Sequence, residues 1–327
     1  MGLKVSANAP GRCGIIGNPT DIYGGRVLSC SVPARATCTL TLGEETSLPE
    51  DLRLWDAAVA RFPIEGPVRV EWSTQIPRSS GVSGSTALLA ATMACVLRVT
   101  GNELDLASAG GLADFAELVR DVERNEAAIM CGYQDAYMVV HGGLQFLDFA
   151  GKHPVTPGPH GRLRAIASPL PFLLITTGVE RLSGSVHGPM AQRWMDGEQL
   201  VVDAMASITE LADVGLAALL KGDWVALGEA MDENHRLIAE LGGSGEPIDL
   251  LISQCKAHGA ISAKLAGAGL GGTVIALTEN ADALEAGLRG DGYSRFMRPV
   301  VAPGVAFSLT PPPLSPITNK MGEGEPR

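Results

Sequence analysis

The feature that most constrains the fold is a loop of small polar residues that leads directly into a strongly apolar segment. Residues 77–87 contain four serines, two glycines and a threonine, and an almost wholly apolar run follows to about Val99. A helix that is apolar on all sides lies in a protein core. The preceding loop would then present free N–H groups and the positive end of the helix dipole, which favour an anion. The segment predicts a phosphate-binding loop, and the alternative is a turn with a Ser or Thr N-cap.

A second glycine loop lies between two apolar segments near the carboxyl end. Gly267, Gly269, Gly271 and Gly272 fall within six residues, which is more glycine than a hairpin needs. No crossover helix follows directly, so a dinucleotide site is disfavoured. The Gly-Lys-Ser/Thr ending of a Walker loop is also absent from the first loop. The second loop is therefore predicted to face a cleft shared with the first loop, and the alternative is a flexible hairpin.

The charge of the chain limits its partners. The formal net charge of -11 over 327 residues disfavours nucleic acid and anionic membranes. No segment approaches the roughly 20 apolar residues that span a bilayer. The six cysteines form no Cys-x-x-Cys pair, which indicates reduced core thiols. We expect a cytoplasmic protein that acts on a small molecule, as a monomer or a homodimer, without nucleic-acid or membrane partners.

The apolar periodicity predicts an α+β fold. Two domains are expected, at 1–160 and 161–310, and the proline-rich and charged tail at 311–327 is expected to be disordered. A loop at 11–25, a hairpin around 141–143 and an inter-domain connection at 150–168 are also predicted. Strands are predicted at 3–7, 27–42, 68–74, 137–140, 144–149, 172–177, 260–265, 273–277 and 295–301. Helices are predicted at 87–99, 112–122, 201–212, 224–241, 248–255 and around 284–288.

Asp135 is the candidate general base. It ends the sequence Gly-Tyr-Gln-Asp at 132–135, where we expect a helix to give way to a strand. Such a position can present a carboxylate to a cleft, and a base for a sugar hydroxyl must be ionised and within hydrogen-bond reach. The alternative is a capping Asp or an Asx-turn.

Two further groups of polar residues fit phosphoryl transfer. A hydroxyl at the helix start, Ser85 or Thr86, can bind Mg²⁺ carried by a nucleotide. Glu123 and Glu126 share a helix face at i, i+3 and could complete the metal site, although a solvated helix face is the alternative.

The amino-terminal loop supplies the remaining candidates. Asn18 and Asp21 can hydrogen-bond sugar hydroxyls, and Arg12 can stabilise charge near a transferring phosphoryl group. The alternative for this segment is a tight turn rich in Pro, Gly and Asn.

The order of these motifs resembles the GHMP kinases. Pro-Gly-Arg at 10–12 and Gly-Asn-Pro-Thr-Asp at 17–21 are similar to the first family motif, with Asn-Pro in place of the usual Glu-His. That replacement resembles the glucuronokinase subgroup. Other matches to this subgroup are Ile-Pro-Arg at 76–78, Gly-Val-Ser-Gly-Ser at 81–85, Gly-Tyr-Gln-Asp at 132–135, His-Gly-Gly-Leu at 141–144, Ser-Gly-Ser-Val-His at 183–187 and Arg-Trp-Met-Asp-Gly at 193–197.

The resemblance implies a fold, two cofactors and a set of roles. The fold would be a ribosomal-protein-S5-like domain followed by a ferredoxin-like domain, and the cofactors would be ATP and Mg²⁺. Asp135 and Arg12 would be catalytic, and Ser85 and Glu126 would hold the metal. The ATP site would comprise Arg78, Ser79, Ser80, Gly81, Val82, Ser83, Gly84, Ser85, Thr86 and Ala87. The acceptor site would comprise Asn18, Asp21, Tyr23, Gln134, His187, Arg193, Gly267, Gly269 and Gly271.

The implied reaction is phosphorylation of a sugar hydroxyl, with the anomeric 1-hydroxyl of D-glucuronate as the leading acceptor. A uronate carboxylate requires a cation, for which Arg181, His187 and Arg193 are candidates. Residues 232–237 and 264–269 are more similar to mevalonate kinases and heptose-phosphate kinases, so these acceptors remain alternatives. A non-catalytic ligand sensor is a more distant alternative, and a dehydrogenase more distant still.

Overall fold

The computed structural model describes residues 3–43, 45–78, 80–102, 104–156, 158–179, 184–267 and 272–308, with the backbone alone for 184–187. The predicted tail at 311–327 lies outside these residues. In the described chain the strands form two sheets. The first has the order β10-β1-β2-β4-β5, and β3 pairs with β2 beside it. Its strands are β1 (Lys4–Ile16), β2 (Arg26–Leu42), β3 (Val68–Thr74), β4 (Leu144–Asp148), β5 (Arg162–Ala165) and β10 (Ala306–Phe307).

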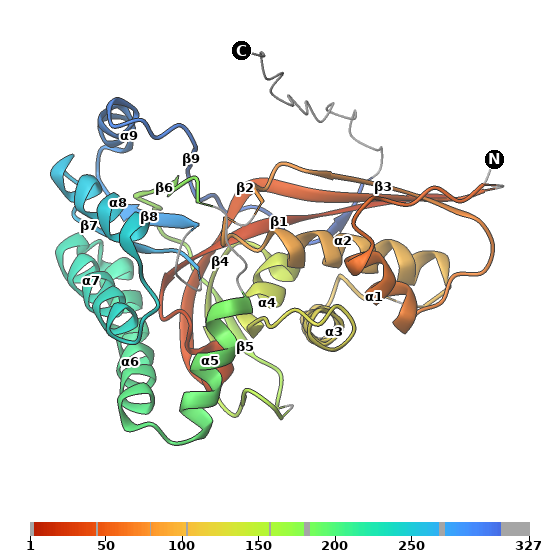
Figure 1. Ribbon diagram of the computed structural model, residues 1–327, viewed down its shortest axis with the longest axis horizontal. Helices are drawn as coiled ribbons and strands as arrows, with labels where there is room; N and C mark the ends of the chain where they lie inside the picture. Colours follow the sequence, from red (N-terminus) through yellow and green to blue (C-terminus); the bar gives the residue numbers. More distant parts are fainter. Residues whose placement is uncertain are drawn as a thin grey trace, which may run out of the picture.

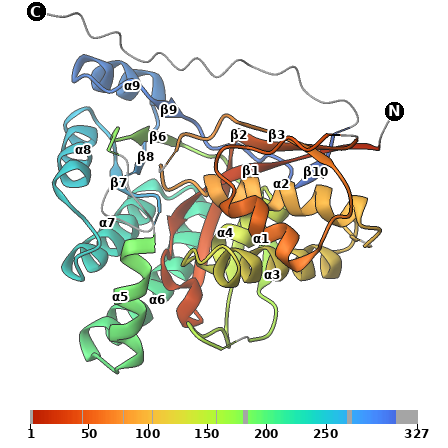
Figure 2. The same cartoon turned by 45° about the vertical axis from the view of Figure 1, so that its right-hand side comes forward.

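Helices α1 to α4 cover one side of the first sheet, as Figures 1 and 2 show. They are α1 (Arg53–Arg61), α2 (Gly84–Val99), α3 (Ala109–Asn125) and α4 (Tyr133–His141). Helix α2 packs on β1 and β2, and eleven of its residues are buried. This confirms that the apolar run after the serine–glycine loop is a core helix.

The second sheet has the order β7-β8-β6-β9. It lies with α8 and α9 at the end of the molecule opposite the amino terminus (Figure 2). Its strands are β6 (Phe172–Thr176), β7 (Ser262–Leu265), β8 (Thr273–Leu277) and β9 (Phe296–Met297). The helices of this half are α5 (Gly184–Met195), α6 (Gln199–Lys221), α7 (Trp224–Glu240), α8 (Glu246–Ala257) and α9 (Ala281–Gly290).

The two halves share apolar core. Helices α6 and α7 contact β1, and Leu216 and Leu227 belong to the same buried cluster as Ile15 and Leu28. The junction between the halves is therefore packed, and residues from both sides can be held at fixed positions across it.

The structure differs from two sequence predictions at the amino-terminal half. Residues 137–140 lie in helix α4 rather than in a strand. Their run of buried apolar residues does not distinguish a buried helix from a buried strand, and packing on α3 and β1 decides it. Strand β1 continues to Ile16, so Pro10 to Arg12 lie in a strand with a register shift against β2 instead of in the predicted loop.

The boundary between the sheets also differs from the predicted boundary at residue 160. Strand β5 pairs with β4, and β10 returns to pair with β1. Both strands follow residue 160 in sequence but belong to the first sheet. The chain thus crosses between the halves more than once.

Gly17 tests how tightly the loop after β1 is held. Its φ is +96°, and an added Cβ would lie 2.2 Å from Arg26 O. Gly66 has a similar φ of +83° with nothing within 4 Å of an added Cβ. We expect Gly66→Ala to lower the free energy of unfolding by about 1 kcal/mol and Gly17→Ala by at least about 3 kcal/mol. Urea unfolding measures both, and equal losses would contradict the packing described here.

Candidate active site

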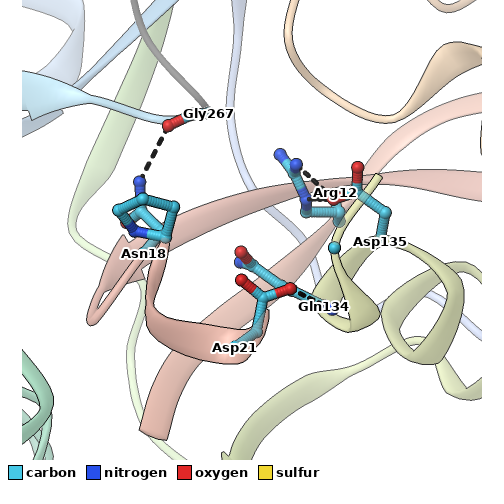
Figure 3. A pocket seen from close by; sticks show the side chains of 8 residues that line it. Arg12, Asn18, Asp21, Gln134, Asp135 and Gly267 are labelled. Atoms are coloured by element: carbon cyan, nitrogen blue, oxygen red, sulfur yellow. Dashed lines mark hydrogen bonds and ion pairs between the residues drawn. The ribbon is translucent and has the colours of Figure 1, made fainter. Parts of the chain in front are cut away.

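A polar pocket lies where the two halves meet. It is narrow, with a cavity volume of about 10 Å³, and it is partly open to solvent. Figure 3 shows its side chains, which come from β1, the loop after it, the start of α4 and the loop after β7. The lining residues are Arg12, Asn18, Pro19, Asp21, Gly132, Gln134, Asp135 and Gly267. Six of the predicted site residues therefore lie together.

Arg12 links the candidate base to both glycine loops. Its Nε donates to Asp135 Oδ1 at 2.6 Å, and its Nη2 forms an ion pair with the same oxygen. Its Nη1 donates to Gly81 O at 2.8 Å and to Ala266 O at 3.5 Å. The guanidinium is buried, with 7% of the side chain exposed. Arg12 thus fixes Asp135 beside the backbone of two loops that are far apart in sequence (Figure 3).

Asp135 lies in the first turn of α4 and not between a helix and a strand as predicted. The helix begins here because Gly132 has an extended conformation as N-cap and because Asp21 Oδ2 accepts from Gln134 N at 2.8 Å. An added Cβ at Gly132 would lie 2.0 Å from the same Asp21 oxygen. Asp21 is therefore buried against the start of α4 and helps to orient Gln134 and Asp135.

The glycine loops pack backbone against backbone. An added Cβ at Gly267 would lie 2.7 Å from Gly81 O, and one at Gly272 would lie 2.7 Å from Ser80 O. Thr273 Oγ1 also donates to Ser80 O at 2.8 Å. This approach explains why the second loop needs glycine at these positions. The other predicted loop residues Ser79, Gly269 and Gly271 lie outside the described residues.

Glu123 is the carboxylate beside the start of α2. Its two oxygens accept from Ser85 Oγ at 2.9 Å and from Thr86 Oγ1 at 2.7 Å. Burial raises the pKa of Glu123 to about 7; the Thr86 hydrogen bond opposes this shift, and the charge of Asp135 adds to it. Ser83 Oγ is also buried and has no hydrogen-bond partner among the described residues.

The sequence-based choice of Glu126 as the metal partner does not fit this geometry. Glu126 is the C-cap of α3, past its last turn, and its Oε1 accepts from Arg61 Nε of α1 at 2.6 Å. Spacing on a helix face could not separate the two glutamates. The distinguishing signal is burial, since Glu123 is 1% exposed and lies on the side of α3 that faces α2.

The residues present fit a magnesium ion carried by a nucleotide. A hydroxyl and a carboxylate, Ser85 and Glu123, are hard oxygen ligands of the type Mg²⁺ prefers. No group of three or more His, Cys, Asp or Glu side chains that could hold a metal occurs in the described part of the chain. Protein ligands this few are typical of Mg²⁺ sites that are completed by phosphate and water.

Residues of the second half form hydrogen bonds with both the side chain and the main chain of Asn18. Its Nδ2 donates to Gly267 O at 3.0 Å and its Oδ1 accepts from Lys264 Nζ at 2.7 Å. Asn234 Oδ1 accepts from Gly17 N at 3.0 Å, and Asn234 Nδ2 donates to Asn18 O at 3.2 Å. Lys264 and Asn234 lie in motifs similar to those of mevalonate kinases and heptose-phosphate kinases, but the sequence alone assigns no role to either residue.

Several predicted residues lie away from the pocket lining. Tyr23 packs against Trp194, with ring centroids 5.3 Å apart. Arg193 donates two hydrogen bonds to Glu198, at 2.8 and 2.6 Å, and the carboxylate balances its positive charge. Arg78 is exposed. The side chain of His187 lies outside the described residues, as does Arg181.

The described helices include none that is long and apolar enough to cross a membrane. All six cysteines are free and buried, as the sequence predicted.

Two family models match the chain. The model for the N-terminal domain of GHMP kinases matches residues 52–143, and the model for the C-terminal part of GHMP kinases matches residues 216–290. The first match contains the serine–glycine loop, Glu123 and Asp135. The second contains Asn234 and the loop after β7.

Known proteins with similar sequences are also kinases. A probable glucuronokinase of Arabidopsis thaliana is 33% identical over 171 residues, which cover 51% of this chain and 45% of that protein. The match thus spans about half the length of either protein. A D-glycero-alpha-D-manno-heptose 7-phosphate kinase of Campylobacter jejuni is 24% identical over 306 residues, covering 82% of this chain and 87% of the relative.

A solved structure supports the fold independently. The galactokinase of Lactococcus lactis, in complex with galactose, superposes with a TM-score of 0.73 at 17% identity, over 93% of this chain and 95% of that one. At this identity the likeness shows the α+β fold alone. Together, the two family models show that the chain belongs to the GHMP kinase superfamily.

Proposed function

We propose that the chain phosphorylates a sugar hydroxyl with ATP and Mg²⁺, and that the anomeric 1-hydroxyl of D-glucuronate is the leading acceptor. The observation that supports this most is the contact of Arg12 with Asp135 and with both glycine loops. It joins a carboxylate, a cation and two phosphate-type loops at one edge of a polar pocket. Phosphoryl transfer needs this combination because it depends on positioning and charge neutralisation.

The serine–glycine loop would hold the phosphates of ATP. Residues 80–83 lead into α2 and residues 84–86 lie in its first turn, where N–H groups point outward and the helix dipole favours negative charge. Ser83 has φ +63° as N-cap, and its buried hydroxyl has no hydrogen-bond partner among the described residues. The predicted neighbours Gly84 and Ala87 form the first turn of this helix.

Ser85 and Glu123 would hold the magnesium ion. When bound, Mg²⁺ neutralises charge on the phosphate oxygens. The carboxylate of Glu123 must be ionised to bind a cation, and its raised pKa shows that burial opposes ionisation in the metal-free protein. A bound cation would favour the ionised form of Glu123, whereas without it the buried charge lowers the stability of the folded protein.

Asp135 and Arg12 would act on the acceptor. Asp135 has 19% of its side chain exposed and lines the pocket, so a hydroxyl can reach its carboxylate. It would orient this hydroxyl and accept its proton, while Arg12 stabilises negative charge at the transferring group. Both residues are held in place before the acceptor binds, which lowers the entropy lost on reaching a reactive geometry.

The pocket favours a polyhydroxylated acceptor. Asp21, Asn18 and Gln134 carry hydrogen-bonding groups, and among the described lining residues Pro19 alone has an apolar ring. The similarity to a glucuronokinase supports glucuronate as the acceptor. A uronate carboxylate requires a cation, but Arg193 already pairs with Glu198. Arg12 likewise pairs with Asp135. The longer similarity to a heptose 7-phosphate kinase favours a heptose 7-phosphate as the second candidate.

A panel of acceptors tests the proposed substrate. We expect ADP release with D-glucuronate to exceed that with D-galacturonate, D-galactose, a heptose 7-phosphate and mevalonate by at least about tenfold in kcat/KM, because a missing or misplaced polar group leaves buried partners unpaired. A preference for the heptose 7-phosphate would select the second candidate. Turnover of mevalonate alone would contradict a sugar acceptor.

The role of Asp135 is tested by Asp135→Asn. We expect kcat to fall at least about a hundredfold, a typical contribution of a general base, with the KM for ATP nearly unchanged. The matched control is Asp121→Asn, which removes a half-exposed carboxylate that pairs with Arg61 at 2.7 Å outside the pocket. An Asp135→Asn enzyme as active as this control would remove Asp135 from the mechanism.

The pKa of Glu123 predicts how pH affects the metal-free protein. Because the folded pKa of about 7 exceeds the ordinary value of 4.5, the folded state binds this proton more tightly. The group's contribution to stability therefore falls as pH rises through this interval. We expect Glu123→Gln to raise the free energy of unfolding by up to about 3 kcal/mol at pH 8 and by less at pH 5, while activity is lost.

Urea unfolding in EDTA at both pH values measures this effect. Glu126→Gln serves as the control, because Glu126 pairs with Arg61 and its loss should not stabilise the protein at pH 8. A Glu123→Gln protein that is less stable than wild type at pH 8 would contradict the buried, ion-poor environment assigned to Glu123.

A further inference from the structure

Lys264 is a buried cation beside the acceptor pocket with no role in the mechanism described so far. It lies on β7 and is 1% exposed. Its Nζ donates to Asn18 Oδ1 at 2.7 Å and to Leu265 O at 2.8 Å. Within the described ranges, no carboxylate forms an ion pair with it. A buried ammonium without a counter-ion costs several kcal/mol, whereas an apolar side chain of similar volume would not.

The surroundings of Lys264 do not compensate this charge. The charged and titratable groups that face it are Arg12 and Cys13 from β1 and His235 from α7. Burial lowers the pKa of Lys264 to about 7; Cys13 opposes this shift and Arg12 adds to it. The pKa of His235 is itself lowered to about 4 by burial and by the charge of Lys264. The main favourable contacts of the ammonium are therefore its two hydrogen bonds.

One of these hydrogen bonds determines which way the amide of Asn18 points. In its protonated form Lys264 can only donate, and it then requires the oxygen of the amide on its side. The amide nitrogen then donates to Gly267 O at 3.0 Å at the pocket, as Figure 3 shows. The flipped amide would set its NH₂ against the ammonium and its oxygen against a carbonyl oxygen, and both contacts would be repulsive.

The backbone of Asn18 is held separately. Asn234 on α7 bonds to Gly17 N and to Asn18 O, so the path of the loop does not depend on Lys264. Asn234 thus contacts the main chain of Gly17 and Asn18, whereas Lys264 contacts the side chain of Asn18.

We propose that Lys264 is a positioning residue that keeps the nitrogen of the Asn18 amide toward the acceptor pocket, so that this point of the pocket receives an oxygen lone pair of the acceptor. The proposal rests on the proposed sugar-kinase function. One amide hydrogen is used by Gly267 O, and the proposal assigns the second to the acceptor. The carboxylate of Asp135, 19% exposed, supplies an accepting group in the same lining. Lys264 itself is not one of the lining residues given above, whereas Asn18 is.

The test combines Lys264→Met, Asn18→Ala and the double variant, with D-glucuronate and ATP as substrates. We expect Lys264→Met to raise the KM for the acceptor about tenfold, as for the loss of one oriented hydrogen bond, with the KM for ATP within about threefold of wild type. Because Lys264 acts through Asn18, the double variant should match Asn18→Ala alone. Lys256→Met is the control, since Lys256 lies on α8 and its Nζ is 2.7 Å from Asp232 Oδ2.

The proposal would be overturned if the fold-losses in kcat/KM of the two single variants multiplied in the double variant. It would also be overturned if Lys264→Met raised the KM for ATP as much as the KM for the acceptor. If Lys264→Met does not fold, Asn18→Ala alone decides, because an unchanged acceptor KM would contradict a role of this amide.

A measurement without an acceptor separates this proposal from the proposed function. The side-chain ¹⁵N–¹H resonances of Asn18, assigned by their loss in Asn18→Ala, should shift and exchange faster with solvent in Lys264→Met than in Lys256→Met. Unchanged resonances would overturn the positioning role. If wild type phosphorylates no acceptor of the panel, the proposed function fails, and these resonances still test the orientation of Asn18.

Discussion

The arrangement of the site depends on one guanidinium. Arg12 bonds to the carboxylate of Asp135 and to the carbonyls of Gly81 and Ala266, and it is buried while doing so. Three segments that are remote in sequence are thereby held at one point. A planar group with five donors is suited to this task, and a lysine would reach fewer of these oxygens at once. The shape of the pocket and the direction of Asp135 both follow from this contact.

Two charged groups near the pocket lie in environments that oppose their charge. Glu123 is buried with a raised pKa, and Lys264 is buried with a lowered one. Neither group would be retained for stability alone, because burial of charge costs free energy that apolar packing does not. Such groups are expected where a protein must bind phosphates and a metal ion, since perturbed pKa values are concentrated at functional sites.

Local sequence patterns predicted the two glycine loops and helix α2, because glycine spacing and a continuous apolar run are local properties. Arg12, Asn18, Asp21 and Asp135 were candidates from their residue types, and the resemblance to the GHMP kinases added Gln134 and the acceptor role of Gly267. Local patterns did not identify α4, since residues 137–140 are buried on all sides and have no distinguishing period. They also could not choose Glu123 over Glu126, because the choice depends on which helix packs against α3 at each point. The partner of Asn18, Lys264, is 246 residues away, and only the fold brings the two together.

The most direct test of a kinase site at this junction is a crystal structure with a non-hydrolysable ATP analogue, Mg²⁺ and D-glucuronate. We predict phosphates against residues 80–86, the metal in contact with Ser85 and Glu123, and an acceptor hydroxyl hydrogen-bonded to Asp135. A nucleotide bound elsewhere, or an Asp135 carboxylate directed away from the bound acceptor, would contradict the assignment of this pocket as the site of phosphoryl transfer.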